Sequence, residues 1–509
     1  MTKLPDSLLN FTLAFISAGL LILVFPNIMF PSHGEAWLAP LALTPLLLAL
    51  AREPRPWIRF LLGEFAGIVY WFGVCYWIQF VLEVHGGMGR WGGWATFMLF
   101  CVAKAIHLGM FSLLAAVLIR TSYAVPAIAA LWTGIERTHG TFGFAWLALG
   151  DAGIDMPLPL RVAPFVGVYG LSFIFALTAV IIALLIRGRG RKELWWLIVI
   201  PAVLLLPDLP AIETPTRNAV VVQPNMPEEQ EWTPASAAAA RDHLVALSLD
   251  STIHAGAEMV IWPEMPGPLY YYHDPVFHEE ATNLARTTQD YFLFGTVADT
   301  PQGAPLNSAV LLRPDGGLVD RYDKINLVPF GEFVPKLFSF VNRITQEAGD
   351  FAPGNRIVVF PVNGHRLGVF ICYESVFPHE VRQFVKQGAN LLVNISNDGY
   401  FGQSAAREQH LEIARMRAVE NRRWLIRSTN DGITAVIDPA GRVTKRLPMY
   451  QQTVSKVAYE YNAGTTVYTE SGDWFAWGCG LAAAVALFCS QLPHYTPRKR
   501  STRQTVSKR

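Results

Sequence analysis

The sequence predicts a helical membrane bundle joined to a layered α/β domain. The 509-residue chain is 52% hydrophobic and only 16% charged, which is too apolar for an ordinary soluble protein. Its long apolar stretches lie near the two ends, whereas the middle alternates short apolar runs with helical patterns. We therefore expect a membrane domain at 1–207, a globular domain at 208–473, a last span at 474–491 and a basic tail at 492–509.

Eight apolar stretches are candidates for membrane-spanning helices. A helix needs about 20 apolar residues to cross the hydrocarbon core, and a shorter stretch can serve inside a bundle. The candidates are 9–30, 36–51, 58–82, 91–119, 122–136, 162–186, 193–207 and 474–490. A cleaved signal peptide is the alternative for residues 1–30, but the apolar run is long for one and no small-x-small cleavage site stands out.

The basic residues predict how the bundle is oriented. They gather in every second loop, and these are Lys3, Arg52, Arg55, Arg59, Arg120, Arg187, Arg189, Arg191, Lys192 and the basic tail. The intervening loops hold only Arg90, Arg137 and Arg161. Because short loops rich in Lys and Arg stay in the cytoplasm, we expect both termini there and the globular domain outside, in the periplasm of a bacterium with two membranes. The net charge of +1 gives no sign of nucleic-acid binding.

The globular domain reads as alternating strands and helices. Runs rich in Val, Ile, Leu and Phe predict strands at 218–223, 258–262, 291–297, 309–313, 366–372, 390–396 and 425–429. Helical patterns lie at 234–254, 275–288, 378–387 and 403–421. This alternation is typical of layered α/β packing.

Cys372 differs from the other four cysteines. Cys75, Cys101, Cys479 and Cys489 lie among apolar residues and are expected to pack like small hydrophobic side chains. Cys372 instead ends an apolar strand, in Gly-Val-Phe-Ile-Cys-Tyr-Glu at 368–374, where a fold presents a nucleophile.

No metal or organic cofactor is expected. The cysteine spacing fits neither a disulfide framework nor a zinc site. Four histidines of the globular domain show no paired ligand spacing, and these are His254, His273, His365 and His410. We expect His410 to support the helix on which it lies.

Two more motifs at strand ends could activate the thiol. Glu264 ends Ile-Trp-Pro-Glu at 261–264, and Lys324 begins a loop that runs to Phe333. A cysteine needs a base or a cation beside it to react at neutral pH. Glu264 could take the proton, and Lys324 could hold the thiolate and then an oxyanion. Each residue alone is more often structural, so the prediction rests on their conjunction.

The chain order Glu264, Lys324, Cys372 resembles the nitrilase, or carbon–nitrogen hydrolase, superfamily, whose Glu-Lys-Cys set lies on an α/β/β/α sandwich. With its membrane stretches, nearly the whole chain resembles the apolipoprotein N-acyltransferase family. Further segments that carry the resemblance are 136–137, 167–173, 323–324, 326–335, 397–398, 401–402, 409–410, 414–420 and 429–432. Gly399-Tyr400 and the 150–153 segment depart from the family pattern, but neither includes a residue of the set.

The resemblance implies a ping-pong acyl transfer in the bacterial inner membrane, without a cofactor. Cys372 would take an acyl chain from a phospholipid, with phosphatidylethanolamine as the expected donor, and pass it to the N-terminal S-diacylglyceryl cysteine of an apolipoprotein. Glu264 would be the general base, and Lys324 would stabilise the oxyanion with the backbone N–H of Tyr373. Supporting positions implied by the resemblance are Trp232, Asn307, Glu332, Tyr373 and Glu374.

Several readings stay open at this stage. A membrane-anchored amidase or nitrilase would share the Glu-Lys-Cys set, and a lipid-binding protein with an inactive domain is a non-enzymatic alternative. The aromatic segments 265–272 and 333–351 fit either the membrane interface or a cover on the sandwich. The ionisable residues Glu64, Lys104, His107 and Glu136 lie in apolar stretches, where such groups pair with each other or meet a lipid headgroup.

Overall fold

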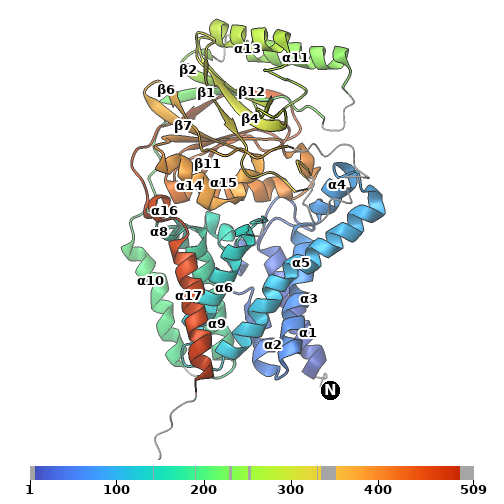
Figure 1. Cartoon of the computed structure of the whole chain (residues 1–509). Coiled ribbons are helices and arrows are strands. Elements are labelled where there is room, and N and C mark those ends of the chain that lie inside the picture. The colour runs from blue at the N-terminus through green and yellow to red at the C-terminus, as the bar shows by residue number, and fades with distance from the viewer. Residues whose placement is uncertain are drawn as a thin grey trace, which may run out of the picture.

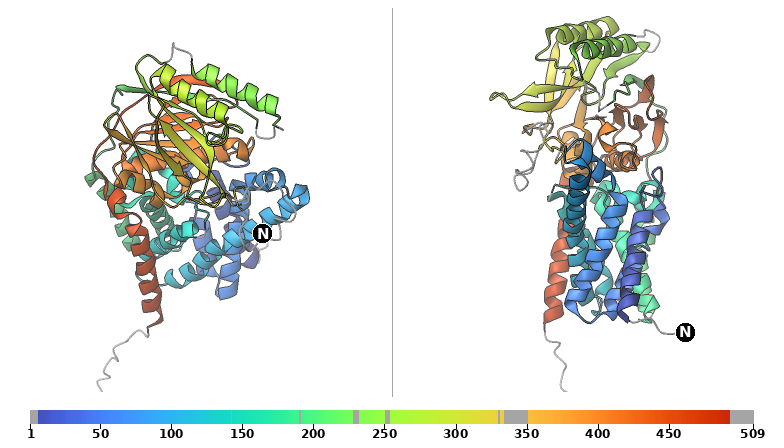
Figure 2. Two further views of the ribbon diagram at one scale, coloured as in Figure 1. Left: turned by 45° about the horizontal axis from the view of Figure 1, so that its top comes forward. Right: turned by 90° about the vertical axis from the view of Figure 1, so that its right-hand side faces the viewer.

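The computed structural model describes residues 6–141, 143–189, 191–227, 232–249, 254–329, 331–333 and 351–492. A helical bundle forms one half of the molecule, and a β-sandwich with helices on both outer faces lies on one end of it (Figure 1). The beginning of α1 and the end of α17 both lie at the opposite end of the bundle, on different sides of it (Figures 1 and 2).

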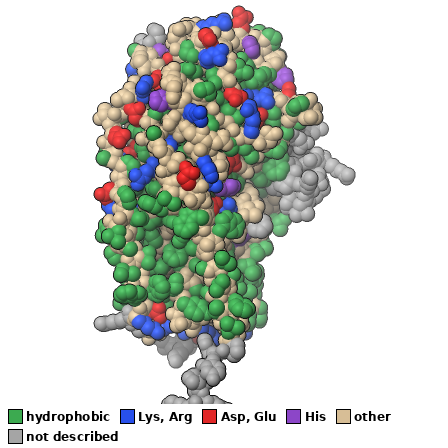
Figure 3. Space-filling model, turned by 60° about the vertical axis from the view of Figure 1, so that its left-hand side comes forward, with side chains coloured by type: hydrophobic (Ala, Val, Ile, Leu, Met, Phe, Trp, Pro, Cys, Tyr) green, Lys and Arg blue, Asp and Glu red, His purple; other side chains and the backbone are tan. Residues whose placement is uncertain are grey.

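The bundle is built from apolar helices on both sides of the sandwich in the sequence. They are α1 (Asp6–Leu23), α2 (Thr44–Arg52), α3 (Pro56–Val74), α4 (Trp77–Val84), α5 (Gly89–Leu118), α6 (Ala124–Thr141), α7 (Pro157–Leu160), α8 (Ala163–Val166), α9 (Val168–Ile186), α10 (Val199–Ala202) and α17 (Trp474–Gln491). On the face seen in Figure 3, hydrophobic side chains cover the bundle, and charged side chains gather on the sandwich and at the far end. Such a belt is typical of a surface that faces lipid.

Within the described residues, five helices are long and apolar enough to cross a membrane: α1, α3, α5, α9 and α17. The other predicted spans contain α2, α6 and a series of short helical pieces over residues 191–205. The count of eight spans therefore stays a prediction.

One predicted span, 58–82, is interrupted. It forms α3 as far as Val74, and the chain then turns and continues as α4 from Trp77. The side-chain amide of Gln409, from the sandwich, donates to the carbonyl oxygen of Val74 at 3.0 Å and to that of Pro26 at 2.6 Å. The α4 helix leaves the bundle and lies beside the sandwich (Figure 1), where the Trp77 ring packs 4.9 Å from that of Phe401.

The sandwich contains two six-stranded sheets. The first has the order β12-β1-β2-β3-β4-β5. Its strands are β1 (Arg217–Gln223), β2 (Ala257–Ile261), β3 (Tyr291–Asp299), β4 (Pro305–Leu312), β5 (Leu318–Asp323) and β12 (Thr453–Tyr459). The second has the order β11-β10-β9-β8-β7-β6. Its strands are β6 (Val359–Val362), β7 (His365–Ile371), β8 (Leu391–Ser396), β9 (Leu425–Thr429), β10 (Ala435–Ile437) and β11 (Val443–Arg446).

Helices cover both outer faces of the sheet pair. α11 (Pro234–Ser248) and α13 (Pro275–Thr288) lie on the side away from the bundle, and α14 (Pro378–Lys386) and α15 (Ala406–Asn421) lie between the second sheet and the bundle (Figures 1 and 2). The short α16 (Val467–Ser471) leads into α17. The predicted four-layer α/β/β/α arrangement is confirmed.

All seven predicted strands are present, and five further strands were not predicted: β5, β6, β10, β11 and β12. β10 and β6 are short, and β11 is largely exposed and polar in sequence. β6 and β10 give a weak signal because they are only four and three residues long. β5, β11 and β12 lie at sheet edges, where one side needs no apolar partner.

The strand directions bring the predicted site together. β1, β2 and β3 run parallel in the first sheet, and β7, β8 and β9 run parallel in the second. The carboxyl ends of parallel strands share one edge of a sheet, which is where α/β proteins bind ligands. Glu264 follows β2 and Cys372 follows β7, so both stand at such edges.

Candidate active site

Cys372 lies at a sharp turn between β7 and a short 3₁₀ helix, Cys372–Val376. Its φ is +49°, in the left-handed region that few residues other than glycine adopt. The residue is only 6% exposed, and its carbonyl oxygen accepts a hydrogen bond from His410 Nε2 at 3.1 Å. Strained backbone of this kind is found where a fold presents a reactive side chain.

Lys324 lies between two carboxylates. Its ammonium donates to Glu264 Oε1 at 3.0 Å and to Glu332 Oε1 at 2.9 Å. All three side chains are at least nine-tenths buried. The structure therefore brings the predicted base and the predicted cation into direct contact.

Asn307 completes this cluster. Its amide nitrogen donates to Glu264 Oε1 at 2.8 Å and to Glu332 Oε1 at 2.6 Å. The second oxygen of each carboxylate accepts a backbone N–H, from Asn397 at 2.9 Å for Glu264 and from Val328 at 2.7 Å for Glu332. Both carboxylates are thus fixed in position by donors on each oxygen.

Electrostatics distinguish the lysine from the cysteine. Burial alone would lower the pKa of Lys324, but Glu264 and Glu332 outweigh it and hold that pKa well above its usual range. Burial raises the pKa of the Cys372 thiol, and Glu264 raises it further, against the opposing effects of Lys324 and the Ser396 hydroxyl. The site therefore holds a charged lysine beside a protonated thiol, so the thiol needs a base before it can attack.

Glu374 connects the nucleophile turn to the lysine loop. One of its oxygens accepts the N–H of Ile371 at 2.7 Å. The other accepts the N–H of Ile325 at 2.6 Å and the Tyr322 hydroxyl at 2.8 Å. The residue is fully buried. Its contacts fix the position of the turn relative to Lys324.

Tyr373 reaches from the sandwich to the bundle. Its hydroxyl donates to the carbonyl oxygen of Gly143 at 2.9 Å. The same side chain lines a cavity of about 700 Å³, together with Val328 and Pro329 of the lysine loop and apolar residues of α4 and α5. A large apolar cavity thus extends from Tyr373, the residue after Cys372, into the bundle.

Trp232 precedes α11, and its ring lies against Gly267, three residues after Glu264. A role of Trp232 in the reaction stays a prediction. Of the aromatic segment 333–351, only Phe333 and Phe351 fall within the described residues.

A buried polar network beneath Cys372 was not predicted. Asp398 accepts from Arg427 at 2.7 Å and from the Ser396 hydroxyl at 2.9 Å. Despite burial, Arg427 and His410 hold the pKa of Asp398 well below its usual range, whereas burial and Arg427 lower the pKa of His410. A neutral His410 donates from Nε2 to the Cys372 carbonyl, so it positions the nucleophile turn as well as belonging to its own helix.

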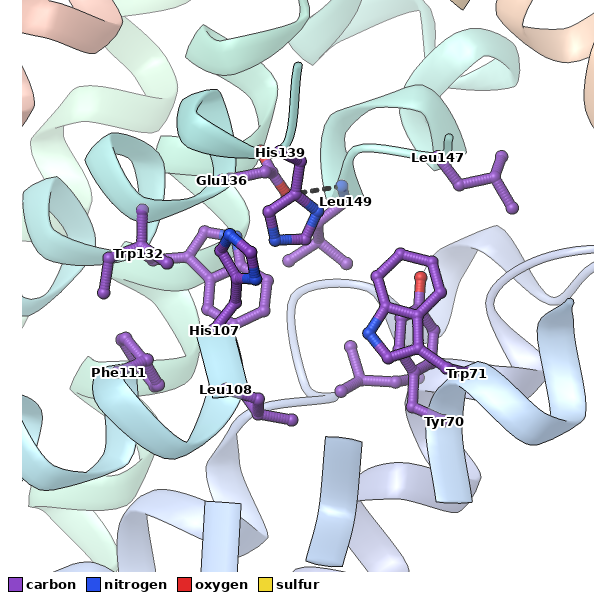
Figure 4. A pocket seen from close by; sticks show the side chains of 12 residues that line it. Tyr70, Trp71, His107, Leu108, Phe111, Trp132, Glu136, His139, Leu147 and Leu149 are labelled. Carbon is purple, nitrogen blue, oxygen red and sulfur yellow. Dashed lines mark hydrogen bonds between the residues drawn. The ribbon is translucent and has the colours of Figure 1, made fainter. Parts of the chain in front are cut away.

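Three of the four predicted ionisable residues of the bundle, Lys104, His107 and Glu136, line two adjoining cavities. Glu64 lines neither of them and lies against Gly109 of α5. Figure 4 shows the smaller one, of about 40 Å³, with the His107 and His139 rings side by side and Glu136 accepting the N–H of Leu149 at 2.7 Å. His107 also lines the larger cavity, as does Lys104. Within the part of the chain that the structure describes, Lys104 forms no ion pair with a carboxylate, and its ammonium donates to the Phe144 carbonyl at 3.0 Å.

Comparison with known proteins identifies both halves of the chain. A carbon-nitrogen hydrolase family model matches residues 219–463, and a model of the apolipoprotein N-acyltransferase N-terminal domain matches residues 17–181. A protein named apolipoprotein N-acyltransferase from Geobacter metallireducens is 33% identical over 502 residues, which cover 94% of each chain. A protein of the same name from Ralstonia nicotianae is 31% identical over 493 residues, which cover 91% of each chain.

Among solved structures, an amidase from Nesterenkonia sp. matches this chain with 17% identity and a TM-score of 0.38, covering 51% of this chain and 94% of the amidase. The two full-length relatives and the two family models agree, and the chain belongs to the apolipoprotein N-acyltransferase family.

Proposed function

We propose that this protein transfers an acyl chain from a membrane phospholipid to the α-amine of the N-terminal S-diacylglyceryl cysteine of apolipoproteins. The observation that carries the proposal is the cavity of about 700 Å³ that Tyr373, next to the nucleophile, shares with the helices of the bundle. A cavity of this size and apolar character fits lipid chains.

In the first half-reaction, Glu264 takes the proton of the Cys372 thiol, and the thiolate attacks the ester carbonyl of the phospholipid. Lys324 and the backbone N–H of Tyr373 stabilise the tetrahedral oxyanion. When the intermediate collapses, the ester C–O bond breaks, and the leaving glycerol oxygen takes the proton from Glu264. The products are a thioester on Cys372 and a lysophospholipid.

In the second half-reaction, the α-amine of the acceptor attacks the thioester carbonyl. Glu264 takes a proton from the attacking nitrogen, and the C–S bond breaks. The sulfur then takes this proton back from Glu264, so the site returns to its starting state with an amide as product. Glu332 and Asn307 keep Glu264 and Lys324 in place through both steps, and Glu374 holds the Cys372 turn.

The proposal includes the setting of the reaction. The bundle at 1–207 and the span at 474–491 would lie in the bacterial inner membrane, with the catalytic domain at 208–473 in the periplasm. Both termini, including the basic tail at 492–509, would be cytoplasmic. This orientation places the site beside the outer leaflet, where a phospholipid such as phosphatidylethanolamine and a lipid-modified acceptor are both available.

A hydrolase of a small amide or nitrile is the second candidate, because it would use the same Glu264, Lys324 and Cys372. The breadth of the apolar cavity argues against it, since a small polar substrate would gain nothing from walls built by α4 and α5. The two functions differ in what resolves the thioester: an amine in one, water in the other.

The test is intact-mass measurement of the detergent-purified protein after incubation with phosphatidylethanolamine alone. The acyltransferase gains one acyl mass, which a synthetic diacylglyceryl-cysteine peptide removes as the N-acyl product. Cys372→Ala gains none, and Cys489→Ala, which removes an exposed cysteine, behaves like wild type. Loss of the acyl mass to water at an equal rate without peptide would support a hydrolase. No adduct at all would overturn the acyltransferase and leave the small-substrate hydrolase or an inactive protein.

A further inference from the structure

Lys104 is a lysine in an apolar setting, and no carboxylate among the described residues pairs with it. It comes from the middle of α5, is only 7% exposed, and lines the cavity of about 700 Å³. Its ammonium lies 4.9 Å from the centre of the Trp71 ring and 5.2 Å from that of Phe144. Figure 4 shows Trp71 on the wall of the adjoining cavity.

These contacts satisfy the ammonium only in part. A lysine has three N–H donors, and here one carbonyl oxygen, that of Phe144, accepts a hydrogen bond at 3.0 Å. The two aromatic rings add cation–π attraction. No carboxylate among the described residues forms an ion pair with it. A buried charge is costly unless it is paired, so this side chain is suited to receive an anion.

The position of Lys104 connects it to the reaction site. Phe144, whose carbonyl accepts from Lys104, follows Gly143, whose carbonyl accepts from the Tyr373 hydroxyl. Lys104 and Tyr373 are therefore hydrogen-bonded to two consecutive residues, Phe144 and Gly143. Lys104 and Tyr373 line the same cavity, so one molecule bound there can contact both the lysine and the residue next to Cys372.

We propose that Lys104 binds the phosphate of the acyl donor and so assists only the first half-reaction. This inference rests on the proposed function. The donor carries a phosphodiester near its ester groups, whereas the diacylglyceryl group of the acceptor carries none. The two lipids occupy the cavity in turn, and the ammonium distinguishes them by charge.

The test compares Lys104→Met with wild type in the two half-reactions. With phosphatidylethanolamine, the variant forms the thioester about ten- to a hundredfold more slowly at low donor concentration, the range expected when one charge-assisted hydrogen bond is lost. Lys104→Met raises the donor concentration at which thioester formation is half-maximal, and it leaves the maximal rate unchanged. Discharge of a preformed thioester by the diacylglyceryl-cysteine peptide keeps its wild-type rate, and Lys104→Arg recovers most of the first step.

A donor without phosphate provides the decisive comparison. With a diacylglycerol, wild type and Lys104→Met form the thioester at the same rate. Met110→Ala shortens a neutral side chain on the same cavity wall, and it slows thioester formation from both donors by the same factor. If Lys104→Met slows thioester formation from both donors equally, the inference is overturned, and Lys104 only packs against the cavity wall. If wild type forms no thioester from either donor, the proposed function itself fails.

Discussion

Glu374 accepts the backbone N–H of Ile325 at 2.6 Å, so the turn that carries the nucleophile is hydrogen-bonded to the loop that carries the lysine. The same carboxylate accepts the N–H of Ile371, one residue before Cys372. Catalysis by positioned groups depends on such constraints, because a displacement of about 1 Å can cost a hundredfold in rate.

Replacing Glu374 by alanine is therefore expected to reduce both stability and acyl transfer. The variant removes the carboxylate acceptor of three backbone N–H groups, those of Ile325, Asn326 and Ile371, which should cost about 3 kcal/mol of unfolding free energy. Thioester formation should fall about a hundredfold. Thermal unfolding and intact-mass kinetics measure the two effects. Glu279→Ala removes an exposed glutamate and is the control; an equally stable and active Glu374→Ala would contradict the positioning role.

The Lys324 cluster predicts a partial rescue. Lys324→Met leaves Glu264 and Glu332 buried together without their cation, and we expect a loss of about 3–5 kcal/mol in unfolding free energy. Adding Glu332→Gln removes one of the two charges and should restore part of that stability. Neither variant should regain activity, because the oxyanion still lacks its cation, a loss of about a thousandfold. Denaturant titration measures the rescue, and additive losses in the double variant would argue against the cluster.

Glu264→Gln should make the resting thiol more reactive while abolishing transfer. Burial raises the pKa of Cys372 first, and the Glu264 charge raises it further. Removing that charge lowers the thiol pKa, so a larger fraction is thiolate at any pH below it, and alkylation accelerates. The measurement is the pH dependence of iodoacetamide labelling of Cys372, with Cys372→Ala as the blank. A labelling profile shifted to higher pH in the variant would refute this electrostatic account.

Gly295 on β3 is expected to tolerate no side chain. A Cβ there would lie 2.6 Å from the Met265 nitrogen and 2.8 Å from the Glu264 Cα. Both are backbone atoms, so Gly295→Ala must displace the base; we expect a loss of about 1–3 kcal/mol and at least tenfold in thioester formation. Gly478→Ala is the matched control, because nothing lies within 4 Å of its added methyl group. Unchanged kinetics in Gly295→Ala would mean that the Glu264 backbone is not held by this contact.

The sequence was informative where a reactive residue follows an apolar strand. Glu264 and Cys372 each end such a run, so their approach at sheet edges could be predicted. The supporting role of Glu374 could not be derived in the same way, because its partners, Ile325 and Tyr322, lie about 50 residues earlier in the chain.

Two further features of the structure depend on tertiary contacts and could not be predicted from the sequence. The stretch 58–82 is largely apolar, yet it breaks after Val74, where a glutamine from the sandwich supplies the missing donor. His410 shows no pattern of its own, and its contact with the Cys372 carbonyl depends on how α15 packs beneath the second sheet. A lone polar residue carries no signal until its partner is known.

The amide of Gln409 has a consequence for how the protein is made. The carbonyl groups of Pro26 and Val74 are synthesised more than 300 residues before the glutamine that satisfies them. The indole N–H groups of Trp77 and Trp146 both donate to the side-chain oxygen of Gln409, so they too lack this acceptor until Gln409 is in place. During translation the helices can insert, but the hydrogen bonds at this end of the bundle stay incomplete until the sandwich has folded. The membrane half therefore acquires its final packing last, although it leaves the ribosome first.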